Sequence, residues 1–307
     1  MEYFRLVAQG RLSEAFGPAA LEVDKAMRTL GIRHSCQNHS ENLHIKEAYE
    51  YTQAYVEGIN EFAQHNMLPI QYYIFGVEFK NWTVDDTCSV LKLMHYSFSH
   101  NWGSEIARDY VEAFSQDSDL VQKLFPFEPT ESIEYVSTVI SDMELKKNLQ
   151  FEDNSDYIYY QTNRKANKTD YFSSILSDIS SQISADINAV GSNSWVVSGN
   201  FTKSKKTIMS NDPHLGNSIP SNVHMSHIIF PDGKFIAGFT VPGTPFHCIF
   251  TTDKVAQSIT SLWADNTDVY EERINENNEY EYMGQMYPLE VREEIIKVKG
   301  QNDTTYQ

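Results

Sequence analysis

The chain has 307 residues, 41% of them hydrophobic and 21% charged, so it can bury one large core or about two smaller ones. This length and composition exclude a disulfide-stapled miniprotein and a wholly disordered chain. With 24 basic residues against 42 acidic ones, the formal net charge of −18 at pH 7 repels phosphate groups, so we expect no nucleic-acid partner.

The first half of the sequence has a helical pattern. From Arg11 to about Asp142, apolar residues recur every three or four positions, as they do in amphipathic helices. Gly-Pro at 17–18 and Leu-Pro at 68–69 interrupt this pattern and predict breaks between helices. Thr83 stands three residues before Asp86, a spacing that is typical of a helix start.

After Gly191 the sequence alternates apolar and polar residues with a period of two, which predicts β-strands. Before that point, between about 151 and 190, the composition shifts to Asn, Asp, Ser, Lys and Tyr, as expected of a linker or a removable spacer. Helices followed by antiparallel strands correspond to the α+β class. The expected strands cover 194–198, 206–209, 223–230 and 234–239.

The three cysteines, Cys36, Cys88 and Cys248, are widely spaced and form no C-x-x-C pair. A bridge between any two of them would leave the third unpaired. We therefore expect three buried thiols rather than a disulfide framework or a zinc site.

The sequence has no apolar run near the roughly 18 residues that a membrane-spanning helix requires, so we expect no membrane span. The first residues include Glu2 and lack the apolar core of a signal peptide. Five Asn-x-Ser/Thr sequons suit a secreted or lumenal protein, but an Asn-rich chain also forms them by chance, so the compartment stays open. The sequons begin at Asn38, Asn81, Asn167, Asn200 and Asn302.

Single polar residues of the second half have ordinary interpretations. Ser192 suits a turn, His214 a loop, and the acidic stretch at 265–268 a solvated turn. The order of the motifs around them is more specific, and it resembles that of the penicillin acylase (penicillin amidase) family of N-terminal-nucleophile hydrolases. The motifs are GRLSEAFG at 10–17, RTLG at 28–31, AYVEGIN at 54–60, GSNSWVVSG at 191–199, NDPHLG at 211–216, VPGTP at 241–245 and DNTDVY at 265–270.

The resemblance implies the αββα sandwich of N-terminal-nucleophile hydrolases, with a helix-rich N-terminal half. It divides the sequence into an α-chain-like region at 1–150, a spacer at 151–191 and the N-terminal part of the nucleophile-bearing β-chain at 192–307. The two chains would form a heterodimer after self-cleavage. Because precursors of the family are longer, we expect this chain to be the middle part of one.

The implied chemistry depends on Ser192. By resemblance to the family, its Oγ attacks the carbonyl of Gly191, an ester forms by an N-to-O acyl shift, and water releases a new N-terminus. Gly191 suits this step because it has no side chain beside the attacked carbonyl. The freed α-amino group has a reference pKa of about 7.7 to 8.0 and can act as the base for its own hydroxyl. The implied substrate is a small-molecule N-acyl amide.

The resemblance assigns further roles around this nucleophile. His214 would orient the N-terminal serine, and the backbone N–H of Ser261 would donate to the oxyanion. A second oxyanion donor would lie beyond Gln307. Leu215 and Ile249 would line the acyl pocket, which suggests an aliphatic acyl group.

The resemblance also implies a structural Ca²⁺ ion and no organic cofactor. Asp265 and Asp268 stand three residues apart around a turn, with the Thr267 carbonyl between them, and such oxygen ligands suit a hard cation. Glu105 of the helical half would complete this part of the site, and the ion would join the two chains.

A different function class stays open beside the amidase. The chain would then be an inactive fragment or pseudoenzyme of the same family that keeps only a binding surface. The N-terminal residues correspond to an interior helix of the family, and part of the β-chain is absent, which would leave sheet edges and apolar surface uncovered.

Overall fold

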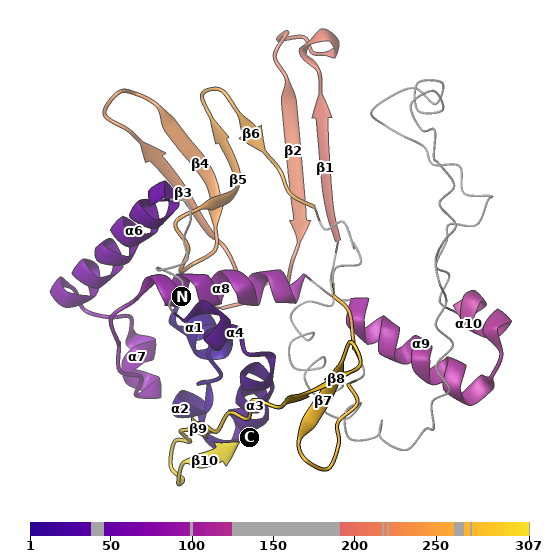
Figure 1. The fold of residues 1–307 in the computed structure, drawn as a ribbon. Coiled ribbons are helices and arrows are strands. Elements are labelled where there is room, and N and C mark those ends of the chain that lie inside the picture. The colour runs from indigo at the N-terminus through magenta and orange to yellow at the C-terminus, as the bar shows by residue number, and fades with distance from the viewer. Residues whose placement is uncertain are drawn as a thin grey trace.

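The structure is a computed structural model that describes residues 1–37, 46–98, 101–124, 191–216, 218–219, 221–260, 267–270 and 272–306. Within these residues, helices occupy the chain up to Leu124 and antiparallel strands begin at Gly191 (Figure 1). This order confirms the α+β class. The αββα sandwich stays a prediction. The predicted spacer at 151–191 lies outside the described residues except for Gly191, which begins the first strand, and the helical pattern beyond Leu124 lies outside them as well.

The described helices fall where the apolar periodicity predicts them, with one addition before Arg11. The predicted breaks are confirmed, because Leu-Pro at 68–69 lies between two α-helices and Gly-Pro at 17–18 lies in a short 3-10 helix, Gly17–Ala20, that separates two others. The helices are α1 (Glu2–Ala8), α2 (Ser13–Phe16), α3 (Leu21–Leu30), α4 (Ile32–Cys36), α6 (Lys46–His65), α7 (Ile70–Phe75), α8 (Val84–Ser97), α9 (Asn101–Ser115) and α10 (Ser118–Leu124).

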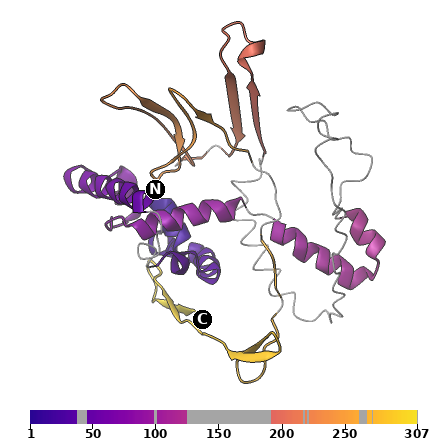
Figure 2. The ribbon, with the colours of Figure 1, turned by 45° about the horizontal axis from the view of Figure 1, so that its top comes forward.

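The strands form separate antiparallel sheets. A hairpin of β1 and β2 stands beside a four-stranded sheet in the order β3-β4-β5-β6, and two further pairs, β7-β8 and β9-β10, follow. Figure 2 shows the hairpin and the larger sheet projecting from one side of the helices. The strands are β1 (Gly191–Val197), β2 (Ile208–His214), β3 (His224–Ile229), β4 (Phe235–Thr240), β5 (His247–Thr252), β6 (Ala256–Gln257), β7 (Glu279–Tyr282), β8 (Gln285–Pro288), β9 (Glu294–Ile296) and β10 (Thr304–Tyr306).

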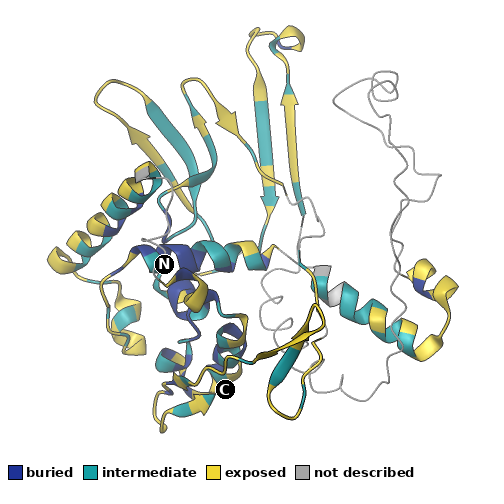
Figure 3. Ribbon diagram, viewed as in Figure 1, coloured by how far each residue is buried: buried dark blue, intermediate teal, exposed yellow. Residues whose placement is uncertain are grey.

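The main hydrophobic core lies where α1, α3, α6 and α8 meet, and the buried residues in Figure 3 gather there. Trp82 is its largest member and is 1% exposed. The indole N–H donates to the Thr87 hydroxyl at 2.9 Å, so the ring is buried with its polar atom satisfied. The Arg5 guanidinium lies over the same ring, 4.8 Å from its centroid, and is itself buried.

The predicted helix start at Thr83 is confirmed as a capping box of α8. The Asp86 N–H donates to Thr83 Oγ1 at 3.2 Å, and the Thr83 N–H donates to Asp86 Oδ2 at 2.8 Å. Asp86 also accepts hydrogen bonds from Arg5 Nη1 at 3.2 Å and from Gln9 Nε2 at 2.5 Å. One carboxylate therefore both caps α8 and joins it to α1.

The expectation of three buried thiols is wrong for two of the cysteines. Cys36 and Cys88 form a disulfide between α4 and α8, with their Cα atoms 5.8 Å apart. Both residues belong to the buried part of the helical half, where the packing of the two helices brings them together. Cys248 is half-buried in β5 and is free.

The helical half and the strand-rich half make direct contacts. Gly243 follows β4 with a φ of +110°, and an added Cβ there would lie 3.0 Å from the Trp82 ring, so this turn needs glycine to approach the core. Its N–H donates to the Tyr55 hydroxyl at 3.3 Å. Farther along, Ile296 and Val298 are buried.

The last strands lie against α3 (Figures 1 and 2). The buried Arg28 side chain forms an ion pair with Glu294. The Ser13 hydroxyl donates to the Lys297 carbonyl at 2.9 Å, and the Lys299 N–H donates to the Ser13 carbonyl at 3.0 Å. These contacts hold the end of the described chain to its first helices.

None of the helices in the described part of the chain combines the length and the apolar content needed to cross a bilayer.

Candidate active site

Ser192 lies in β1, one residue from its start, and not in a turn. The antiparallel register places Gly191 opposite His214 and Ser192 opposite Pro213. His214 is therefore the last residue of β2 rather than a loop residue. In Figures 1 and 2, the ends of β1 and β2 that carry these residues are the ends nearest the helices. The hairpin thus brings His214 opposite Gly191, which stands 23 positions earlier in the sequence.

The Ser192 hydroxyl contacts the carbonyl that self-cleavage would attack. Its Oγ donates a hydrogen bond to the Gly191 carbonyl oxygen at 2.7 Å, and the side chain is half-buried. The Ser192 hydroxyl and the Gly191 carbonyl group are therefore adjacent, and an intramolecular attack would also require Oγ to approach the carbonyl carbon.

His214 contacts the glycine side of the same peptide bond. An added Cβ on Gly191 would lie 3.4 Å from His214 Nδ1. Side chains alternate between the two faces of a strand pair, so His214 shares a face with Gly191, and Ser192 shares the other with Pro213. His214 therefore lies beside the residue that precedes Ser192.

Asp212 is a site residue that the sequence interpretation missed. Its Oδ2 lies 2.9 Å from His214 Nε2, although 44% of the histidine side chain is exposed. Residues two apart on a strand point to the same face, and this spacing was the signal available in the NDPH motif. A carboxylate on one ring nitrogen fixes the orientation of the imidazole.

The other predicted site residues are placed by different elements. Leu215 directly follows β2, whereas Ile249 lies in β5 of the four-stranded sheet, where it pairs with Phe239. Both are half-buried. Ser261 lies outside the described residues, two positions after Ile259.

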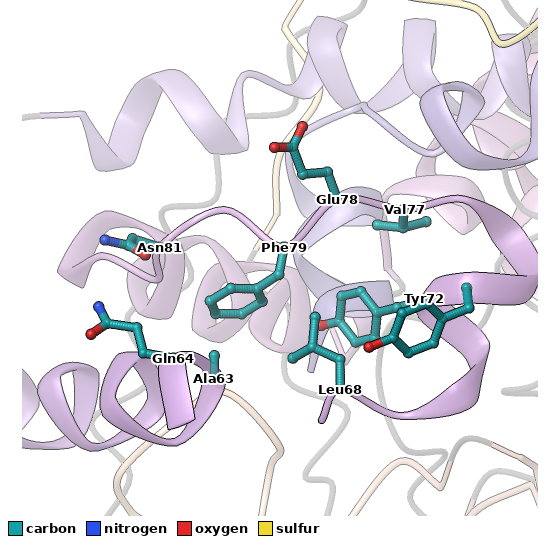
Figure 4. Close-up of a pocket in the computed structure, with 9 residues that line it drawn as sticks. Ala63, Gln64, Leu68, Tyr72, Val77, Glu78, Phe79 and Asn81 are labelled. Carbon is teal, nitrogen blue, oxygen red and sulfur yellow. The ribbon is translucent and has the colours of Figure 1, made fainter. Parts of the chain in front are cut away.

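A cavity of about 430 Å³ occurs elsewhere, in the helical half between α6, α7 and the segment at 77–81. Leu68, Tyr72 and Phe79 are among the lining residues that the close-up of Figure 4 draws. None of the predicted site residues that the structure describes lines this cavity, so it is separate from the β1-β2 hairpin that carries Ser192.

The predicted calcium ligands are described only in part. Asp265 lies outside the described residues, and in the described ranges no three His, Cys, Asp or Glu side chains cluster as a metal site. The Tyr270 hydroxyl donates to Asp268 Oδ2 at 3.3 Å. The negative charge of Asp268, and more weakly that of Glu105, raises the pKa of Tyr270. Glu105 of α9 and Asp268 carry carboxylate oxygens, which are the donor type that Ca²⁺ prefers.

Comparison with known proteins shows which family the chain belongs to. The family described as penicillin amidase matches the chain over residues 1–307. The chain belongs to the penicillin amidase family. This match confirms the resemblance seen in the order of the sequence motifs.

The relatives of this penicillin amidase family member include named acylases. It is 27% identical to the acyl-homoserine lactone acylase QuiP of Pseudomonas aeruginosa, covering 98% of this chain and 34% of that protein. It is 29% identical to the protein of the same name from Pseudomonas fluorescens, covering 98% of this chain and 35% of that protein. A penicillin acylase 2 proenzyme from a Pseudomonas species is 27% identical and covers 100% of this chain. The chain spans about a third of the length of these curated relatives.

Proposed function

We propose that this chain belongs to a self-processing amidohydrolase that cleaves linear N-acyl amides through Ser192. The observation that carries the proposal is the 2.7 Å hydrogen bond from the Ser192 hydroxyl to the Gly191 carbonyl, at the start of β1. The membership of the penicillin amidase family supports the reaction class.

Self-processing converts one peptide bond into a new chain end. Ser192 Oγ attacks the Gly191 carbonyl carbon and its proton passes to the amide nitrogen, which leaves as the α-amino group of Ser192. Water then hydrolyses the Gly191 ester and regenerates the hydroxyl. His214 lies against Gly191, and Asp212 fixes its ring, so this pair shapes the space around the bond that breaks.

The released Ser192 would then act on substrates. Its neutral α-amino group takes the hydroxyl proton as the oxygen attacks the acyl carbonyl, and the same proton is returned to the leaving amine. Water then hydrolyses the acyl ester on Ser192, which releases the acid and regenerates the hydroxyl. The backbone N–H of Ser261 is the proposed first donor to the oxyanion. Hydrolysis should therefore rise with pH as the α-amino group loses its proton, near a reference pKa of about 7.7 to 8.0.

The substrate class is a small N-acyl amide. The relatives are named as acylases of acyl-homoserine lactones and of penicillin, both of which carry an acyl group on nitrogen. Leu215 and Ile249 are the proposed acyl contacts, and their aliphatic side chains favour an aliphatic acyl chain.

The test measures two products, which are a new N-terminus at Ser192 and a free amine released from the substrate. The protein expressed from its complete reading frame should give an N-terminal peptide that begins at Ser192, and it should release free amine from an N-acyl-homoserine lactone. An intact bond between Gly191 and Ser192, together with no amine release, would support the inactive form of the family instead.

We further propose a structural Ca²⁺ ion held by Glu105, Asp265, Asp268 and the Thr267 carbonyl, which would link the helical chain to the nucleophile chain. Adding Ca²⁺ to about 100 times its dissociation constant should stabilise the protein by about 2.7 kcal/mol, measured as a higher melting temperature. Glu105→Gln should reduce this response, and Glu112→Gln on the same helix serves as its control. An equal melting temperature with Ca²⁺ and with chelator would contradict the site.

A further inference from the structure

The Asn211 side chain in β2 connects three backbone segments. Its Nδ2 donates to the Asn193 carbonyl of β1 at 2.9 Å and to the Ile259 carbonyl at 3.2 Å. Its Oδ1 accepts from the Ile259 N–H at 3.1 Å. Both ends of the amide are therefore used, and every partner is a main-chain atom.

The two bonds to Ile259 reproduce the pairing of a β-ladder. A strand neighbour offers one donor and one acceptor to the residue opposite, and the Asn211 amide offers the same pair from a side chain. A second contact lies alongside, because the Ser194 and Ser258 hydroxyl oxygens are 2.6 Å apart. The segment after β6 is thereby attached to the β1-β2 hairpin, and Figure 1 shows it running from the larger sheet towards the hairpin.

This attachment point is adjacent to the proposed chemistry on both sides. Asn193, whose carbonyl Asn211 holds, is the residue after Ser192. Ile259, whose backbone Asn211 holds, precedes Ser261 by two residues. The same amide therefore contacts the strand of the nucleophile and the segment that leads to the proposed oxyanion donor.

We propose that Asn211 is a positioning residue that fixes the backbone at Ile259 relative to the strand that carries Ser192. This inference rests on the proposed function of Ser192. The acyl carbonyl must lie between nucleophile and oxyanion donor, so a change in their separation affects the transition state more than substrate binding.

Two variants separate positioning from folding. Asn211→Ala removes all three hydrogen bonds. Asn211→Asp has nearly the same shape and keeps an acceptor for the Ile259 N–H, but it loses both donated bonds and faces two carbonyl oxygens with a charge. Asn200→Ala is the matched control, because Asn200 lies at the far end of the same hairpin and is exposed.

The experiment measures amide hydrogen exchange and steady-state hydrolysis on the protein expressed from its complete reading frame. Both Asn211 variants should lower kcat by about 10- to 100-fold with KM changed less than about 3-fold. Peptides that contain Ile259 should exchange about 10-fold faster in Asn211→Ala, and Asn200→Ala should match the parent in both measurements.

Unchanged exchange and unchanged kcat in Asn211→Asp would overturn the proposal, and so would a loss confined to KM. If Asn211→Ala does not fold, the result for Asn211→Asp alone tests the proposal. Failure of the proposed function is seen separately, as hydrolysis that persists in Ser192→Ala. The exchange measurement does not depend on activity, so it tests the attachment in either case.

Discussion

Replacing Ser192 with alanine is expected to leave the chain uncut before position 192 and to lower amide hydrolysis by about 10⁴-fold or more. Alanine removes the oxygen that lies 2.7 Å from the Gly191 carbonyl and leaves the strand itself unchanged. The α-amino group is then never released, so the variant loses the base as well as the nucleophile. Intact-mass spectrometry and an amine-release assay measure the two losses.

Ser210→Ala is the control for this variant. Ser210 lies in β2 opposite Trp195, on the same hairpin, and its backbone pairing does not depend on its hydroxyl. It should process and hydrolyse like the parent. A new chain end before position 192 in Ser192→Ala would mean that another nucleophile cuts this bond, and the assignment of Ser192 would be wrong.

Replacing Cys36 and Cys88 together with serine is expected to lower the free energy of unfolding by about 4 kcal/mol. The disulfide joins two residues that are 52 positions apart, so its loss increases the conformational entropy of the unfolded chain. It also removes a covalent link between α4 and α8, and α8 supplies Val90 and Leu93 to the core. Denaturant unfolding of the double variant, with and without reductant, measures the effect.

Cys248→Ser is the matched control, because Cys248 is the free cysteine of the three. It should change stability little, and reductant should still destabilise it. Alkylation of the unreduced, denatured parent should label one thiol. Labelling of three thiols would contradict the disulfide and restore the original expectation from the sequence.

Local features of the fold could be predicted, and long-range ones could not. The start of α8 depends on Thr83 and Asp86, three residues apart, so the sequence contains the whole capping box. The strands around Trp195 and Phe235 follow from alternation alone. The disulfide depends on how α4 and α8 pack. The positions of the three cysteines in the sequence do not indicate which two of them come into contact.

The site shows the same division. Ser192 and His214 stand in motifs that resemble those of a family, and the hairpin places His214 opposite Gly191, the residue before Ser192. The sequence predicts no separate role for Asp212 or Asn211, which stand in the same NDPH motif as His214. The role of each depends on its partner, a histidine ring for one and the backbone of Ile259 for the other, and that partner is visible only in three dimensions.

The contacts between the first helices and the last strands have a consequence for a cut at Gly191. Such a cut breaks one covalent bond and none of the interactions of Gly243 with Trp82, of Arg28 with Glu294, or of Ser13 with Lys297. Separating the two pieces would expose a buried guanidinium and an indole to water. Such a cut would therefore turn these contacts into a subunit interface, and unfolding would then be a bimolecular equilibrium that depends on protein concentration.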